Sequence, residues 1–182
     1  MVSLALACLL GFNFQQPETV YPEQVTKPVE QKQQTILTFR RLDVPMDSVL
    51  QEFTYDLCWR HKIDFTLIMA MIKVESNFKP DAISKTDDYG LMQINKINHP
   101  RLVAKFGITD FLDPYANIVA GTSIVKELFN KYHTPEKVLM AYNMGEAGAA
   151  RLWKQGIFEI NYSKKVLAVQ REYEKYIRGN KK

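Results

Sequence analysis

The chain has 182 residues, a length that fits one domain with some spare sequence and argues against two full domains. Hydrophobic residues make up 46% and charged residues 24%, which is typical of a globular protein. The formal net charge is +4, and no arginine-rich run or aromatic platform predicts a nucleic-acid partner. The two cysteines, Cys8 and Cys58, support neither a disulfide framework nor a Cys/His site, so we expect no metal and no cofactor.

The amino-terminal segment is short, uncharged and mostly apolar over residues 2–12. It has about half the length of a membrane-spanning helix and matches the apolar core of a signal peptide, although the basic stretch that normally precedes such a core is missing. We interpret residues 1–13 as a signal-like or anchor segment, which could be cleaved, lipidated at Cys8 or truncated. This interpretation predicts an exported protein of the cell envelope or the extracellular space.

Residues 14–43 are predicted to be a flexible linker. Residues 15–34 contain six Gln, three Pro and three Glu, with almost no large apolar side chains. Such a stretch buries too little apolar surface to offset the entropy lost on ordering. We therefore expect it to act as a tether for the domain that follows.

From residue 44 onward the spacing of apolar residues and the capping signals indicate helices. Asp64 can cap a helix over residues 65–77, which Pro80 prevents from continuing. Asp113-Pro114 predicts the start of a helix to about residue 132. Residues 46–61 form a further predicted helix with an apolar stripe of Val49, Leu50, Phe53, Leu57 and Cys58. Thr134-Pro135 predicts the start of a helix that ends near Gly145, and Gly156 is a later stop signal. Ser163 can cap a final helix to about residue 178. Because no segment alternates as a strand does, the predicted fold class is all-α.

Glu75 stands out because it lies on the apolar stripe of its predicted helix. At 100° per residue, the side chains within about 60° of it are Ile68, Met71 and Ile72. A carboxyl group in such surroundings must be paired or its pKa must rise, and the negative end of the helix adds to this effect. A raised pKa suits a general acid near neutral pH. The alternative is an ion pair with Lys79, which requires that residue to stay helical before Pro80.

Three blocks in order, Glu75-Ser76, residues 90–94 (Gly-Leu-Met-Gln-Ile) and residues 141–145 (Ala-Tyr-Asn-Met-Gly), resemble the signature blocks of the soluble lytic transglycosylases. This family is related in fold to goose-type lysozyme. The resemblance runs from about residue 44 to 176 and includes Asp-Pro-x-x-Asn-Ile at 113–118. It implies a lysozyme-like catalytic domain over residues 44–182, with a substrate cleft between helical lobes.

The resemblance also implies an activity and a set of site residues. The family cleaves the bond between N-acetylmuramic acid and N-acetylglucosamine in peptidoglycan without water and leaves a 1,6-anhydro end. Glu75 matches the single catalytic acid and base. Ser76 matches a polar neighbour, Met92 an apolar wall of the cleft, and Tyr142 and Tyr162 match tyrosines that hold the carboxylate. The amides of Gln93 and Asn143 match sugar-binding residues, with capping of helix ends as the alternative role for both.

Two rival functions remain open. In a true hydrolase, Asp87 or Asp88 would activate a water molecule, since most glycoside hydrolases use two carboxylates; the alternative role of both residues, and of Asp81, is turn formation. The second rival is an inactive wall-binding module of a phage tail or secretion apparatus. The expected partner in each case is the peptidoglycan glycan strand, and we expect a monomer, tethered to a membrane if the amino-terminal segment is retained.

Overall fold

The structure is a computed structural model that describes residues 39–179, and these residues are mainly helical. The elements are α1 (Ser48–His61), α2 (Phe65–Ser76), β1 (Asp88–Tyr89), β2 (Ile94–Asn95), the 3-10 helix η1 (Lys96–Asn98), α3 (His99–Phe106), α4 (Pro114–Tyr132), α5 (Pro135–Lys154) and α6 (Asn161–Gly179). The described part of the sheet is one antiparallel hairpin of two-residue strands, with Asp88 opposite Asn95. The predicted all-α class is confirmed.

The predicted helix starts at Asp64 and Asp113 are confirmed. The Asp64 carboxylate accepts a hydrogen bond from the main-chain N–H of Thr66 at 2.7 Å, and Asp113 accepts one from Ala116 at 2.8 Å. Each bond satisfies one of the N–H groups that lack a partner in the first turn of a helix. Helix α5 begins at Pro135 as predicted, although the preceding threonine makes no capping bond with its side chain.

The predicted helix end at Gly145 is confirmed, because this residue has the non-helical angles φ 73° and ψ 158°; a second helical segment follows it within α5, to Lys154. Two other features differ from the sequence prediction. Ser163 is not the cap of the last helix, because α6 already begins at Asn161 and the Ser163 hydroxyl bonds to the main chain of Ile160. Helix α3 was not predicted, since its eight residues bury only one large apolar side chain.

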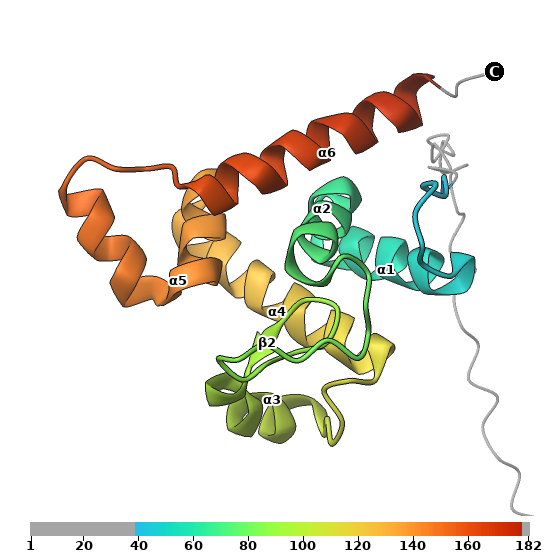
Figure 1. The fold of residues 1–182 in the computed structure, drawn as a ribbon, viewed down its shortest axis with the longest axis horizontal. Coiled ribbons are helices and arrows are strands. Elements are labelled where there is room, and N and C mark those ends of the chain that lie inside the picture. The colour runs from blue at the N-terminus through green and yellow to red at the C-terminus, as the bar shows by residue number, and fades with distance from the viewer. Residues whose placement is uncertain (1–38, 180–182) are drawn as a thin grey trace, which may run out of the picture. The chain divides into compact units, whose positions relative to one another are not determined.

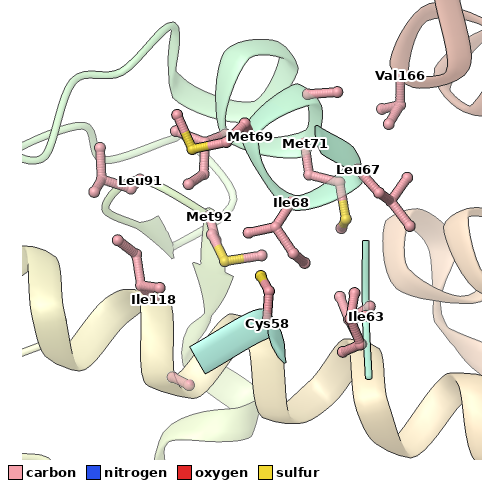
Figure 2. Close-up of a cluster of buried hydrophobic side chains, with 14 of the residues drawn as sticks. Cys58, Ile63, Leu67, Ile68, Met69, Met71, Leu91, Met92, Ile118 and Val166 are labelled. Atoms are coloured by element: carbon pink, nitrogen blue, oxygen red, sulfur yellow. The ribbon is translucent and has the colours of Figure 1, made fainter. Parts of the chain in front are cut away.

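Helix α2 lies in the middle of the core. Its residues 67–72 are at most 2% exposed, and α6 crosses over it (Figure 1). Figure 2 shows side chains of α1, α4, α6 and the loop before β2 gathered around it, among them Cys58, Ile118 and Val166. A helix buried on nearly all sides is held by packing rather than by propensity. The last turn of α2 is therefore fixed inside the domain.

The loop around the hairpin is bonded to α4 through the fully buried side chain of Asn117. Its amide nitrogen donates to the main-chain oxygens of Tyr89 at 2.8 Å and Phe111 at 2.7 Å, and its amide oxygen accepts from the N–H of Met92 at 2.8 Å. Gly90 has φ 73°, and a Cβ there would lie 2.3 Å from the Asn117 amide nitrogen. Only glycine therefore fits at this point of the loop.

The predicted linker is too long at its carboxyl end, because residues 39–43 pack on the helices. Leu42 is 1% exposed, and its main-chain N–H and C=O both bond to the side chain of Gln51. The ring of Phe39 lies 5.4 Å from that of Tyr55 and 5.9 Å from that of Phe65, between centroids. Residues 1–38, with the predicted anchor and most of the linker, lie outside the described residues. None of the described helices is long and apolar enough to cross a membrane.

The packing of Leu42 leads to a prediction about truncation. Deleting residues 1–38 should leave the melting temperature nearly unchanged, because the composition of residues 14–38 predicts a linker. Extending the deletion through residue 43 should lower it clearly, since loss of one buried leucine side chain alone costs about 2–5 kcal/mol. Thermal denaturation of the two truncated proteins beside the full chain measures both effects. Equal melting temperatures for the two deletions would contradict the packing role of residues 39–43.

Candidate active site

A cavity of about 780 Å³ brings together residues that are far apart in the sequence. Glu75 reaches it from the end of α2, Asp88 and Gln93 from the hairpin, and Tyr142 and Asn143 from α5. The volume lies within the range of roughly 300–1,000 Å³ that is usual for ligand sites. Glu75 and the polar residues of the two other signature blocks thus face one space.

The Glu75 carboxyl group is largely buried and accepts a hydrogen bond from the hydroxyl of Tyr162 at 2.5 Å. Burial raises its pKa to about 7; the Tyr162 bond acts in the opposite direction, and the nearby charge of Asp88 adds to the rise. At neutral pH a group with this pKa is present in comparable amounts of its protonated and its ionised form, so it can both give and take a proton. The Lys79 alternative is not supported, because α2 ends at Ser76 and no ion pair of the described residues joins Glu75 to Lys79.

The two tyrosines have different partners. Tyr162, in the first turn of α6, donates to Glu75, whereas the hydroxyl of Tyr142 donates to the main-chain oxygen of Met92 at 2.7 Å. Burial, followed by the nearby charge of Glu75, raises the pKa of both tyrosines well above the usual value. Both hydroxyls therefore stay neutral donors. Tyr142 lines the cavity and lies close enough to Glu75 to feel its charge, but its hydrogen bond fixes α5 to the hairpin loop.

The amides of Gln93 and Asn143 both line the cavity. Gln93 has a left-handed backbone with φ 47°, and its side-chain nitrogen donates to the main-chain oxygens of Gly90 at 2.9 Å and Ala82 at 3.1 Å. These bonds resemble the backbone-capping role considered above, and they also fix the orientation of the amide. Asn143 is exposed on α5, where a ligand could reach its side chain.

Three predicted site residues do not line the cavity, namely Met92, Ser76 and Tyr162, which reaches it only through its bond to Glu75. Met92 is fully buried, and a Cβ at Gly121 would lie 2.3 Å from its sulfur, so its side chain fills the core between α2 and α4 instead of forming a wall of the cleft (Figure 2). Ser76 is also buried, and its hydroxyl donates to the main-chain oxygen of Ile72 at 3.2 Å within the same helix. A helical serine with this back-bonding has its hydroxyl engaged locally. Ser76 and Met92 are next in the chain to Glu75 and Gln93, but their own side chains face the core and not the cavity.

Asp88 faces the same cavity as Glu75, which the sequence interpretation as a turn residue did not foresee. Its carboxylate accepts bonds from Ser84 and Thr86, both at 2.6 Å, and from Asn95 at 2.7 Å. Burial acts to raise its pKa, but the three donors outweigh it and lower the pKa below the usual value. Asp88 is therefore ionised at neutral pH. The neighbouring Asp87 does not line the cavity.

The cavity has no donor set for a metal. Within residues 39–179, no group of three or more His, Cys, Asp or Glu side chains could hold an ion. The site instead offers one carboxyl group with a pKa near 7, one ionised carboxylate, two neutral tyrosines and two amides. These groups can transfer protons to and from a bound ligand.

Comparison with known proteins identifies the family. The sequence profile of the transglycosylase SLT domain matches residues 56–162. The chain therefore belongs to this family, as the signature blocks predicted.

Curated relatives have similar sequences. A "Peptidoglycan-binding-like protein" of Escherichia coli O157:H7 is 40% identical over 47% of this chain and 59% of its own length. The "Membrane-bound lytic murein transglycosylase C" of Pectobacterium atrosepticum is 33% identical over 52% of this chain and 30% of its own length. The "Invasion protein IagB" of Salmonella typhimurium is 31% identical over 60% of this chain and 72% of its own length. The chain thus spans between about a third and three quarters of these relatives.

A solved structure supports the lysozyme-like fold. An inactive mutant of the lytic transglycosylase Slt from Pseudomonas aeruginosa superposes with a TM-score of 0.62 at 20% sequence identity. The match covers 74% of this chain and 25% of that one. At this identity the likeness shows the fold alone, and the predicted fold class is confirmed.

The raised pKa of Glu75 makes stability depend on pH. Because its pKa of about 7 in the folded state exceeds the ordinary value of 4.5, the folded protein binds more protons between these values, and stability falls as pH rises through them. The Glu75→Gln variant lacks this penalty, so its free energy of unfolding relative to the wild type should rise between pH 5 and 7, by at most about 1.4 kcal/mol per pH unit, and level off above the pKa of about 7. Thermal denaturation at several pH values measures the difference. The exposed Glu52→Gln variant is the control, and an equal pH trend in both variants would contradict the assignment.

Proposed function

We propose that this protein is a peptidoglycan lytic transglycosylase and that Glu75 is its single catalytic acid and base. The observation that carries the proposal is the buried Glu75 carboxyl group, with a pKa raised to about 7 and oriented by Tyr162, at the wall of a ligand-sized cavity. Membership of the SLT family supports the same reaction. The substrate is the bond between N-acetylmuramic acid and N-acetylglucosamine.

The reaction needs one carboxyl group because the nucleophile is part of the substrate. Protonated Glu75 gives its proton to the glycosidic oxygen, and the bond from that oxygen to C1 of the muramic ring breaks. The carboxylate then takes the proton of the C6 hydroxyl, whose oxygen bonds to C1. This step forms the 1,6-anhydro ring and restores the protonated acid. The attacking hydroxyl lies close to C1 in the same molecule, which gives it a high effective molarity relative to bulk water.

The neighbouring side chains support these steps in distinct ways. Tyr162 keeps the carboxyl group in one orientation, and its neutral hydroxyl can stabilise the ionised form between the two proton transfers. The amides of Gln93 and Asn143 are proposed to bind the sugar, since both line the cavity and one is fixed by two main-chain bonds. Tyr142 is proposed to form the wall that positions the sugar and to fix α5. Ser76 and Met92 have no direct part, because the Ser76 hydroxyl bonds to Ile72 within its own helix and the Met92 side chain is fully buried.

One observation favours a second candidate, a two-carboxylate hydrolase. Asp88 is ionised and lies in the same cavity as Glu75, as a base that activates water would. Its three hydrogen bonds, however, make this carboxylate a weak base, because the donors stabilise the ionised form. We therefore propose that Asp88 raises the pKa of Glu75 and does not activate water.

The relatives indicate where the protein acts. Proteins named membrane-bound lytic murein transglycosylase support a location at the cell envelope. We propose that residues 1–13 direct or anchor the chain there, that residues 14–38 act as a tether, and that the catalytic domain works as a monomer. The described helices contribute no membrane span.

Replacing Glu75 by Gln tests the proposed activity. The variant keeps the shape and can still accept the Tyr162 bond, but it has no proton to transfer, so the rate should fall at least about 10²-fold. Release of muropeptides from purified cell walls measures the rate, and mass spectrometry identifies the product. The wild type should give 1,6-anhydro ends, one water lighter than hydrolysis products. A well-folded Glu75→Gln protein with near wild-type activity would exclude this role, and a wild type without activity would favour the wall-binding module.

Paired variants of the two neighbouring aspartates separate transglycosylase from hydrolase. Asp88→Asn removes a negative charge near Glu75, so the Glu75 pKa should fall and the alkaline limb of the pH–rate profile should move to lower pH. Anhydro products should persist. Asp87→Asn is the matched control, because this residue is next in the chain but lies outside the cavity, and it should leave the profile unchanged. Reducing-end products from the wild type that disappear in Asp88→Asn would assign the hydrolase reaction instead.

A further inference from the structure

The solvent-facing side of α6 carries the surplus positive charge of the described domain. Residues 39–179 contain 20 Lys and Arg and 17 Asp and Glu, and α6 contains five of these cations and two of these anions. The surplus of three on α6 therefore equals that of all the described residues together, and residues 39–160 are neutral by formal charge. None of the α6 cations lines the cavity, so the proposed reaction does not use them.

Helical periodicity gathers most of these cations into one basic stripe. At 100° per residue, four of the five lie within about 60° of one another, and all four are exposed: Lys164, Arg171, Lys175 and Arg178. The opposite side of the helix packs on the core through Val166 and Tyr173, where α6 crosses α2 (Figure 1). The two anions, Glu172 and Glu174, lie about 80° to either side. The basic stripe thus points to solvent.

Ion pairs involve only the two ends of the basic stripe. Glu159 lies 3.4 Å from Lys164, and Glu174 lies 3.2 Å from Arg178. Within residues 39–179, the two cations at the centre of the stripe form no ion pair. The two end pairs are exposed, and such pairs are weak because water and salt screen them. An anionic surface can therefore attract the whole stripe.

The amino-terminal part of the chain joins the described domain beside the carboxyl end of the basic stripe. The Nη1 of Arg40 donates to the main-chain oxygen of Ile177 at 3.3 Å. Residues 39–43 and the last turns of α6 lie at the same end of the domain (Figure 1). In the sequence, α6 is followed by Lys181 and Lys182, which add to the positive charge at this end.

The length of the predicted tether suits contact between the basic stripe and a membrane. A flexible linker with the 25 residues of segment 14–38 spans about 25–30 Å on average. Helix α6, with 19 residues, is about 28 Å long. An anchor at residues 1–13 therefore keeps the stripe within reach of the membrane surface, where attraction extends over about one Debye length, roughly 8–10 Å.

We propose that the basic stripe of α6 binds a membrane surface with anionic lipid headgroups, so that the catalytic domain lies against the membrane to which residues 1–13 tether it. Anionic phosphate groups complement the surplus charge of this face. A short apolar anchor alone binds weakly and reversibly, and a basic patch supplies the second contact that makes attachment stable. The proposal goes beyond the cleavage reaction and does not depend on it.

Binding of the full chain to lipid vesicles tests the proposal without substrate. Co-sedimentation compares phosphatidylcholine vesicles with vesicles that also contain phosphatidylglycerol. The wild type should prefer the anionic vesicles, and high salt should remove the preference. The double variant Arg171→Gln with Lys175→Gln should bind the anionic vesicles roughly 30-fold more weakly, since each cation near an anionic membrane contributes about fivefold. Its affinity for the neutral vesicles should not change.

The matched control is the double variant Arg151→Gln with Lys154→Gln. It removes the same charge from the last turns of α5, where both side chains are exposed and form no ion pair among the described residues. It should keep most of the preference, and melting temperatures confirm that both variants are folded. An equal loss in the two double variants, or a wild type without preference for anionic vesicles, would overturn the proposal. Binding to soluble polyglutamate but not to vesicles would assign an acidic protein partner instead.

Discussion

The side chain of Asn117 is the interaction on which the site depends most. Its amide makes three bonds with the main chain at Tyr89, Met92 and Phe111, in a place without exposure to solvent. Loss of such an amide would leave several buried main-chain groups without partners, each costing about 1–3 kcal/mol. Because Met92 also accepts the bond from Tyr142, one peptide segment links α4, the hairpin and α5. The positions of the hairpin groups relative to Glu75 follow from this linkage.

Two carboxyl groups in one cavity have opposite protonation preferences because their immediate surroundings differ. Glu75 is buried at the end of a core helix with one hydrogen-bond donor, and its pKa rises. Asp88 has three donors from its own loop, and its pKa falls. Proteins separate acid from base roles in this way, through burial and hydrogen bonding rather than through residue type. The site therefore contains one group that can transfer a proton, Glu75, beside one that stays negatively charged, Asp88.

The same cavity extends from the groups around Glu75 to the paired charged residues of α3, α4 and α5. The glycine kink at Gly145 separates the segment of α5 with Tyr142 and Asn143 from the segment with Glu146, so one helix contributes to both. The φ and ψ of Gly145 lie in a region that only glycine occupies readily.

The sequence by itself determined the family, the all-α class, the starts of the helices after Asp64 and Asp113, and the place of Glu75 on the apolar face of its helix. These features depend on short-range signals, since capping, proline placement and helical periodicity all act within a few residues. Only the tertiary structure decided that Met92 fills the core, that Asp88 shares the cavity with Glu75, and that Arg101 faces it. Adjacent residues of one loop receive opposite surroundings there, because a left-handed backbone at Gln93 and the bonds of Asn117 turn the chain sharply. Contacts between segments 25 or more residues apart leave no local pattern by which a sequence could reveal them.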